Sequence, residues 1–199
     1  MKAVLIADGN YITKIAKNDY GLRHSNLPHS LFNIFEQYRD LIKEVDLHLL
    51  RIRYHDSPAF LPNNDPTAEE QKEYDKKEFF FKKHITPYQR IDLIRGRCQR
   101  ITVNGNYEYN QKGVDVNMAI DIVQYSATVD TIIVVSADSD LIPAFVLAKT
   151  KGAEVVLVTS EKVKRFPDSS VDKLINAADL HFVIEKEMLK KSSQMSIKR

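Results

Sequence analysis

Residues 131–152 read TIIVVSADSDLIPAFVLAKTKG, and two kinds of pattern meet within them. The first part, TIIVVSAD (131–138), is rich in β-branched residues and predicts a buried strand. The second part, SDLIPAFVLAKTKG (139–152), predicts a helix. A strand that passes directly into a helix is typical of a parallel sheet. Asp138 and Asp140 then lie at the carboxyl end of a central strand.

The same alternation of strands and helices continues on both sides of this junction. AVLIAD (3–8) is a short apolar run that stops at an Asp-Gly pair, which predicts a first strand. The predicted elements are strand 3–8, helix 31–43, strand 45–56, basic strand 91–104 with a turn at 104–106, helix 113–127, strand 131–138, helix 139–152, strand 153–160, helix 169–179 and strand 180–184. We therefore predict an α/β fold with a mostly parallel central sheet and helices on both faces.

One segment interrupts this alternation and predicts a helical insertion. Residues 57–90 begin with the proline-rich turn sequence SPAFLPNNDPT and continue as AEEQKEYDKKEFFFKKH, a charged helix with aromatic residues. The chain of 199 residues suits one domain, residues 1–190, that contains this insertion. The sequence leaves open whether the insertion is a lid, a dimer contact or a specificity element. We expect residues 191–199 to form a flexible basic tail.

Composition and charge exclude several classes of protein. Hydrophobic residues make up 43% of the chain and charged residues 28%, which suits a soluble domain with a real core. No apolar run is long enough to span a bilayer, and MKAVLIADGN predicts a strand rather than a signal peptide. The single Cys98 excludes an internal disulfide and a cysteine-based zinc site, so we expect a cytoplasmic protein. The net charge of +2 is too small to diagnose a nucleic-acid binder.

Four aspartates fall where a single crevice is predicted. Asp8 closes the first strand, Asp138 closes the central strand and Asp140 follows two residues later. The carboxyl ends of parallel strands border the crevice in which such sheets bind ligands. Asp115 lies near the start of its helix and can point into the same crevice. Carboxylates gathered there repel one another unless a cation neutralises them, and Mg²⁺ or Mn²⁺ prefers oxygen ligands.

Each aspartate also has a simpler interpretation. Asp140 could cap the helix that follows it, and Asp115 could offset the partial charge of a helix N-terminus. Asp8 and Asp138 could be ordinary turn residues at strand ends. The conjunction of all four favours a metal site. Asp121 follows Asp115 by roughly 240° around a helix, so we expect it to support the site or the fold rather than share the metal.

Three segments resemble the signature segments of a known family. They are ADGN (7–10), QKGVDVNMAIDIV (111–123) and VVSADSDLIPAF (134–145), and they resemble NYN domains, PIN-like nucleases that include the bacterial LabA-like group. The resemblance spans nearly the whole chain in order. It implies a three-layer, Rossmann-like PIN fold. It also implies metal-dependent cleavage of RNA, with RNA as the substrate and Mg²⁺ or Mn²⁺ as the cofactor.

The resemblance further implies which residues form the site. The acidic positions of the family, which are catalytic and bind the metal, fall on Asp8, Asp115, Asp138 and Asp140. The secondary candidates are Asn10, Lys112, Asp121 (a frequent family acid), Ser136 and Ser139. Two positions depart from the family pattern. Tyr11 stands where many members carry Asn, so that Asn10 would take its place, and Ala137 stands where Gly is usual.

Basic residues before the second signature segment are candidates for RNA binding. On a strand over 91–104, alternation places Arg95, Arg97 and Gln99 on one face and Arg100 on the other. A basic strip beside an acidic crevice would hold a nucleic-acid backbone by charge. The RNA-binding candidates are therefore Arg95, Arg97 and Arg100.

Three further features bear on substrate binding. Lys112 is the family's lysine before Gly-Val-Asp and could contact a phosphate near the metal. FFFKKH (79–84) could stack on bases, although three consecutive Phe more often pack a helix onto the core or a dimer partner. The six histidines show no metal-ligand spacing.

Several functions remain open. The first is a metal-dependent ribonuclease, with endonucleolytic cleavage as the expected mode. The second is a non-catalytic or weakly catalytic NYN-type regulator that binds RNA or a protein partner, and either protein could form a homodimer. A haloacid-dehalogenase-type phosphatase is disfavoured, because its Asp-x-Asp belongs at the end of the first strand, where Asp8 is followed by Gly9-Asn10. No G-x-G-x-x-G follows that strand either, which disfavours a dinucleotide-binding enzyme. The cluster of like charges favours the ribonuclease.

Overall fold

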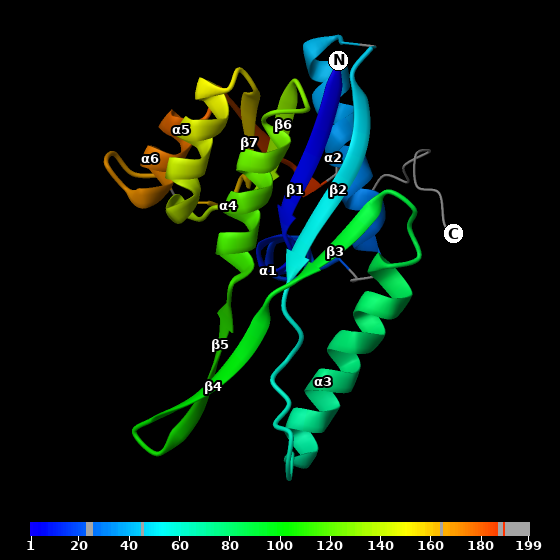
Figure 1. Ribbon diagram of the computed structural model, residues 1–199, viewed down its shortest axis with the longest axis vertical. Helices are drawn as coiled ribbons and strands as arrows, with labels where there is room; N and C mark the ends of the chain where they lie inside the picture. The colour runs from blue at the N-terminus through cyan, green and yellow to red at the C-terminus, as the bar shows by residue number, and fades with distance from the viewer. Residues whose placement is uncertain (23–25, 45, 164, 187–188, 190–199) are drawn as a thin grey trace.

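A six-stranded parallel sheet forms the centre of the computed structural model, which describes residues 1–22, 26–44, 46–163, 165–186 and 189. The strand order is β3-β2-β1-β6-β7-β8, and every pairing in this sheet is parallel. The strands are β1 (Lys2–Asp8), β2 (His48–Asp56), β3 (Ile91–Arg95), β6 (Thr131–Val135), β7 (Glu154–Ser160) and β8 (Leu180–Ile184). The carboxyl ends of β1 and β2 point to the same edge of the sheet (Figure 1).

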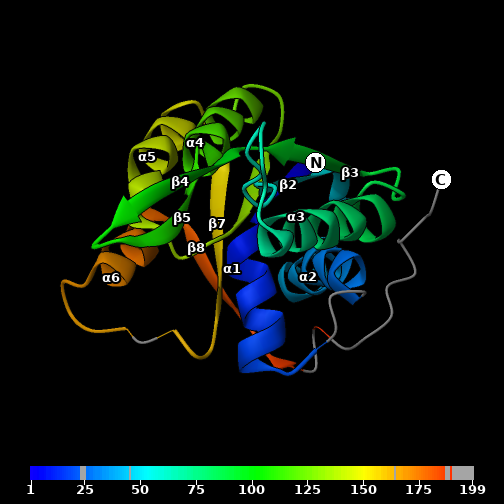
Figure 2. The ribbon, with the colours of Figure 1, turned by 90° about the horizontal axis from the view of Figure 1, so that it is seen from below.

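Two layers of helices cover the sheet (Figure 2). The helices are α1 (Gly9–Lys14), α2 (Leu27–Ile42), α3 (Ala68–Phe80), α4 (Val114–Tyr125), α5 (Ile142–Thr150) and α6 (Ser170–Ala177). Strand β1 is apolar on both faces, because alternate side chains enter two separate cores. Leu5 packs in the core with α1 and α2, whereas Ile6 packs in the core with α4, α5 and α6. This arrangement confirms the predicted three-layer α/β fold with a parallel sheet.

Two projections extend beyond the carboxyl edge of the sheet (Figure 1). One is α3, which begins at a capping box between Thr67 and Glu70. The other is an antiparallel hairpin of β4 (Arg97–Val103) and β5 (Asn106–Lys112). Asn104 and Gly105 turn this hairpin with φ angles of 51° and 81°, as a two-residue turn of type I′ requires. The extended chain after β2 runs between the two projections.

The structure differs from the predicted elements in several places, among them β5, which was not predicted as a strand, and α2, which begins four residues before the predicted helix over 31–43. Residues 9–19, for which no element was predicted, form α1 and a π-helical turn, Ile15–Asp19. The predicted strand over 91–104 is divided at Gly96 into β3 of the main sheet and β4 of the hairpin. The strand predicted over 131–138 ends at Val135. The predicted basic tail, residues 191–199, lies outside the described residues. No helix in the described ranges is long and apolar enough to cross a membrane.

Candidate active site

Asp8 ends β1 and at the same time caps α1. Its Oδ1 accepts hydrogen bonds from the backbone N–H groups of Asn10, at 2.9 Å, and Tyr11, at 3.0 Å. Burial raises the pKa of the Asp8 carboxyl from 3.8 to about 6, against the opposing effect of these two hydrogen bonds. Negative charges on Asp115 and Asp56 raise this pKa further. The carboxyl is therefore held in place through one oxygen in a region of negative potential.

Asp138 is held in a similar way at the end of the central strand. It follows Val135 by three residues, and its Oδ1 accepts a hydrogen bond of 2.9 Å from the backbone N–H of Asp140. The backbone N–H of Asp138 in turn donates to Ser136 Oγ at 3.1 Å. The residue that caps the helical turn Ser139–Leu141 is thus Asp138, and the interpretation of Asp140 as the cap is wrong. Asp140 remains exposed to solvent.

Asp115 connects these two strand ends. It lies in the first turn of α4, which begins after Gly113 in a left-handed conformation with φ of 79°. Partial burial raises the pKa of Asp115, and the negative charges of Asp138 and Asp140 raise it further. Asp115 also raises the pKa of Asp8. The structure therefore brings Asp8, Asp115, Asp138 and Asp140 within electrostatic reach of one another.

A pocket of about 370 Å³ opens beside Asp8 and Asp138. Its lining residues are Asp8, Asn10, Tyr11, Lys14, Ala137, Asp138, Ser139 and Ser170. Asn10 and Ser139 thus lie at the crevice, whereas Ser136 is buried beneath it. The phenol of Tyr11 is oriented away, since it accepts a hydrogen bond of 3.1 Å from the backbone N–H of Ser160. Lys112 is exposed at the end of β5, two residues before α4 begins.

Asp121 lies elsewhere, in a network with residues of β2. Arg53 donates to it through Nε at 2.8 Å and through Nη2 at 3.2 Å, and His55 Nε2 lies 2.9 Å from Asp121 Oδ2. These partners lower the pKa of Asp121 although burial opposes the shift. The guanidinium of Arg53 also lies over the ring of Tyr125. Asp121 therefore joins α4 to the sheet and does not enter the crevice.

Asp56 is an acid of this edge that the sequence analysis passed over. It ends β2, is fully buried, and receives hydrogen bonds from Lys77 Nζ at 2.7 Å, the backbone N–H of Ser57 at 2.8 Å and Gln111 Nε2 at 3.3 Å. A Cβ atom on Gly9 would come within 2.7 Å of Asp56 Oδ2, so the carboxyl packs directly against the start of α1. The rule that identified Asp8 also applies to Asp56, because each is an acid at the carboxyl end of a parallel strand.

The donor set suits a hard divalent cation, because it consists of carboxylates that repel one another. Within the described ranges, the Oδ2 atoms of Asp8 and Asp138 accept no hydrogen bond, so each aspartate has an oxygen left for a cation. The carboxylates are nevertheless not drawn together into a finished site. In the part of the chain that the structure describes, no group of three His, Cys, Asp or Glu side chains is arranged to hold an ion.

The predicted basic strip is not formed. Arg95 ends β3 and pairs with Glu78 of α3, while Arg100 lies in β4 and donates to Glu70 Oε1 at 2.8 Å. Among the three arginines, Arg97 alone has no ion pair with a described residue, and it stands opposite Lys112 in the hairpin. The charges of Arg95 and Arg100 therefore fix α3 to β3 and the hairpin.

The aromatic run of the insertion packs mainly inward. Phe80 and Phe81 are buried in the core that α1 and α2 share, whereas Phe79 is 59% exposed. Lys77 Nζ lies 5.2 Å from the ring centroid of Phe81. Two of the three phenylalanines thus anchor α3 to the domain, as the simpler interpretation of this run expects.

Comparison with known proteins places the chain in a family. The NYN domain model matches residues 2–186. No curated protein matches the chain. The crystal structure of VPA0982, a protein of unknown function from Vibrio parahaemolyticus RIMD 2210633, is similar with a TM-score of 0.52 and 12% identity over 94% of each chain, which shows a shared fold. A structure solved in work on Sir2 enzymes has a TM-score of 0.41 and 9% identity over 94% of this chain and 88% of that one. The chain belongs to the NYN domain family, a group of PIN-like nucleases.

Proposed function

We propose that this protein is a metal-dependent ribonuclease of the LabA-like type that hydrolyses RNA phosphodiester bonds. The observation that carries the proposal is the charge of the crevice. Asp8 is partly buried near Asp56 and Asp115, with a pKa raised to about 6, and the charges of Asp138 and Asp140 in turn raise the pKa of Asp115. Such a cluster of like charges destabilises the fold whenever no cation is bound to it. Membership of a nuclease family makes nucleic acid the substrate class.

In this proposal Asp8, Asp115 and Asp138 hold Mg²⁺ or Mn²⁺, and Asp140 either joins them or positions water. A bound ion of this kind binds phosphate oxygens, lowers the pKa of water and stabilises the leaving oxygen. The protein's own contribution is to orient the ligands. Backbone N–H groups fix Oδ1 of Asp8 and of Asp138, so that Oδ2 of each is free to bind. Ser136 holds the backbone of Asp138 in place.

Lys112 and Arg97 supply the positive charge for the RNA backbone. They stand opposite each other at the base of the hairpin, and neither has an ion pair with a described residue. Lys112 also lies two residues before the start of α4, the helix that carries Asp115. In the proposed reaction, water adds to phosphorus, the P–O bond to the neighbouring ribose breaks, and a proton of the water passes to the departing ribose oxygen.

The decisive experiment is RNA cleavage with the purified full chain. Single-stranded and structured RNA are incubated with Mg²⁺, with Mn²⁺ and with chelator, for the wild type and for Asp138→Asn. Asn retains the capping oxygen, so the variant tests the charge rather than the turn. We expect metal-dependent cleavage that the variant loses. Cleavage that survives chelator, or that the variant retains, would refute the mechanism.

The second candidate is a non-catalytic NYN-type regulator. The observation that favours it is that the described carboxylates are not already arranged around an ion position. Binding of RNA without cleavage under any metal condition would establish this alternative. Residence in the cytoplasm and assembly into a homodimer stay predictions, to be tested by fractionation and by light scattering.

A further inference from the structure

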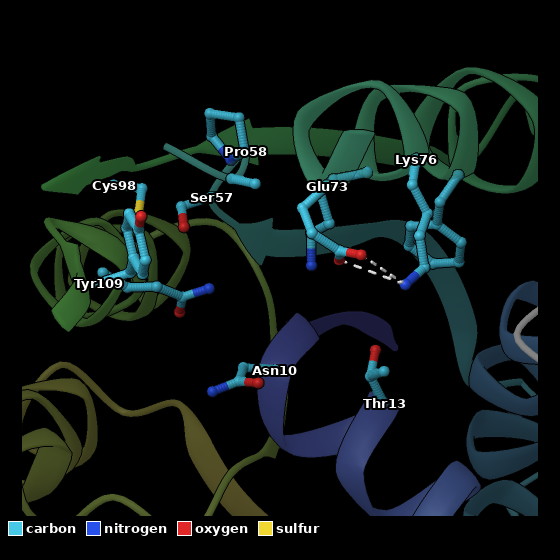
Figure 3. A pocket seen from close by; sticks show the side chains of 12 residues that line it. Asn10, Thr13, Ser57, Pro58, Glu73, Lys76, Cys98 and Tyr109 are labelled. Atoms are coloured by element: carbon cyan, nitrogen blue, oxygen red, sulfur yellow. Dashed lines mark hydrogen bonds and ion pairs between the residues drawn. The ribbon is translucent and has the colours of Figure 1, made fainter. Parts of the chain in front are cut away.

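A second pocket, of about 410 Å³, adjoins the acidic crevice. It lies between α1, the chain just after β2, α3 and the hairpin, and Asn10 lines both this pocket and the crevice. Figure 3 shows Ser57 and Tyr109 on one side of it and Asn10 on the other. Lys77 and Gln111 line the pocket, and both donate to the carboxylate of the buried Asp56. Asn10 therefore lies between the crevice and this pocket.

One buried polar atom in this pocket has no partner. Ser57 is 1% exposed, and its Oγ makes no hydrogen bond with any described residue. In Figure 3 this hydroxyl points into the pocket, toward Asn10. A buried hydroxyl without a partner costs about 1–3 kcal/mol, so such atoms are rare in proteins unless water or a ligand satisfies them. Ser57 therefore indicates a ligand that offers hydrogen-bonding groups.

The charges of the pocket do not suit an anion. Lys76 Nζ lies 3.2 Å from Glu73, and Lys77 Nζ lies 2.7 Å from Asp56, so each ammonium group already has a carboxylate partner. The remaining groups are neutral. Gln111 uses its Nε2 on Asp56 and keeps Oε1 as an acceptor, and the side-chain amide of Asn10 makes no hydrogen bond to a described residue. Apolar surface comes from Pro58, Phe80 and the ring of Tyr109.

We propose that this pocket binds an unpaired nucleobase of the RNA strand, next to the phosphate that lies in the acidic crevice. A base combines flat apolar faces with neutral donors and acceptors on its edge, which is the chemistry of this lining. Ser57 Oγ, Gln111 Oε1 and the Asn10 amide contact the edge, while Tyr109 and Pro58 contact the faces. The inference rests on the proposed function, because that function brings RNA to the neighbouring crevice.

Binding of matched oligomers with and without bases tests the proposal. Short single-stranded homopolymers of each of the four ribonucleotides are compared with an oligomer of equal length and charge whose riboses carry hydrogen in place of the base. Fluorescence anisotropy with the full chain carrying Asp138→Asn avoids cleavage. We expect at least one homopolymer to bind more tightly than the abasic oligomer. Ser57→Ala and Gln111→Ala should each reduce that ratio about 5- to 10-fold, the effect of one lost hydrogen bond.

Two controls exclude a merely structural effect. Asn110→Ala removes an amide from the neighbouring position, which points to the opposite face of the hairpin, and should leave the ratio unchanged. Ser57→Ala should leave the free energy of unfolding unchanged or raise it, since it removes a buried atom without a partner. Affinity for the abasic oligomer should be the same in all of these proteins.

Each result has one interpretation. Equal affinity for all oligomers, no binding to any of them, or a ratio that neither Ser57→Ala nor Gln111→Ala changes overturns the base pocket. Base-dependent binding that both variants weaken supports the pocket even if the cleavage assay is negative, in which case only the nuclease proposal fails. Metal-dependent cleavage with an unchanged ratio supports the nuclease and overturns the pocket alone.

Discussion

Replacing Asp8 with Asn should make the metal-free protein more stable while it removes the proposed activity. The carboxylate of Asp8 is buried near Asp56 and Asp115, so its charged form is disfavoured in the folded chain. The Asp8→Asn variant removes that charge and keeps an oxygen that can accept from the N–H groups of Asn10 and Tyr11. Asn is about as good an N-cap as Asp, so the turn into α1 should persist.

The magnitude follows from the pKa of Asp8. A rise from 3.8 to about 6 corresponds to a penalty of about 3 kcal/mol for the charged carboxyl in the folded state. The folded chain binds the proton more tightly than the unfolded chain, so stability falls as the pH rises from 3.8 to about 6. The Asp8→Asn variant has no carboxyl to ionise at this position, so it does not lose this stability. Its advantage should therefore be about 2–3 kcal/mol well above pH 6 and absent below pH 3.8.

Urea unfolding in chelator gives the free energy of unfolding by linear extrapolation, for both proteins at a pH above and a pH below this window. Asp40→Asn is the matched control, because its carboxyl is 72% exposed and should contribute little. Added Mg²⁺ should then stabilise the wild type and not the variant, since only the wild type has the full ligand set. A variant that is equally stable or less stable than the wild type above pH 6 would refute the electrostatic reasoning.

Three further substitutions test other contacts. Lys77→Met should lower the free energy of unfolding by about 2–4 kcal/mol, because it leaves the buried Asp56 without its cation. Urea unfolding should show that the second substitution Asp56→Asn restores most of this loss. Asp121→Asn should lower the free energy of unfolding by about 2–4 kcal/mol, because Arg53 loses its closest partner and keeps only Asp92 at 3.4 Å. Asp115→Asn, which breaks no ion pair with a described residue, should not lower it, and equal losses would refute this role of Asp121. Gly9→Ala should lower the free energy of unfolding by about 1–3 kcal/mol and reduce the melting temperature, because the new Cβ would lie 2.7 Å from both Tyr54 Cζ and Asp56 Oδ2. An unchanged melting temperature would mean that this packing adjusts freely.

The sheet could be predicted from the sequence because its strands are continuous apolar runs. β1 and β6 are buried on both faces, and only a sheet covered by helices on each side buries such strands. The position of Asp8 and Asp138 at one edge follows from this topology alone. The helix that follows β1 was harder to predict. α1 is short, and its cap is Asp8 itself, which was interpreted as a candidate ligand or a turn residue and not as the start of a helix.

The capping residue near β6 could not be predicted from local sequence. Asp138 and Asp140 are two acids with the same capping chemistry, and only the backbone path after Val135 decides that the first of them accepts the hydrogen bond. The projections depend on long-range contacts. Arg100 reaches Glu70, which is 30 positions away, and Arg95 reaches Glu78, and no periodic pattern in the sequence encodes such pairs.

The ion pair between Lys77 and Asp56 bears on how this domain could be divided. α3 belongs to a segment that interrupts the alternation of strands and helices, which suggests a detachable module. Yet it carries the cation that balances a carboxylate at the end of β2, and its last turn places Phe80 in the shared core. Deleting 57–90 should therefore not yield a minimal folded domain. We expect changes in length to be tolerated best just before Thr67, where the chain is exposed.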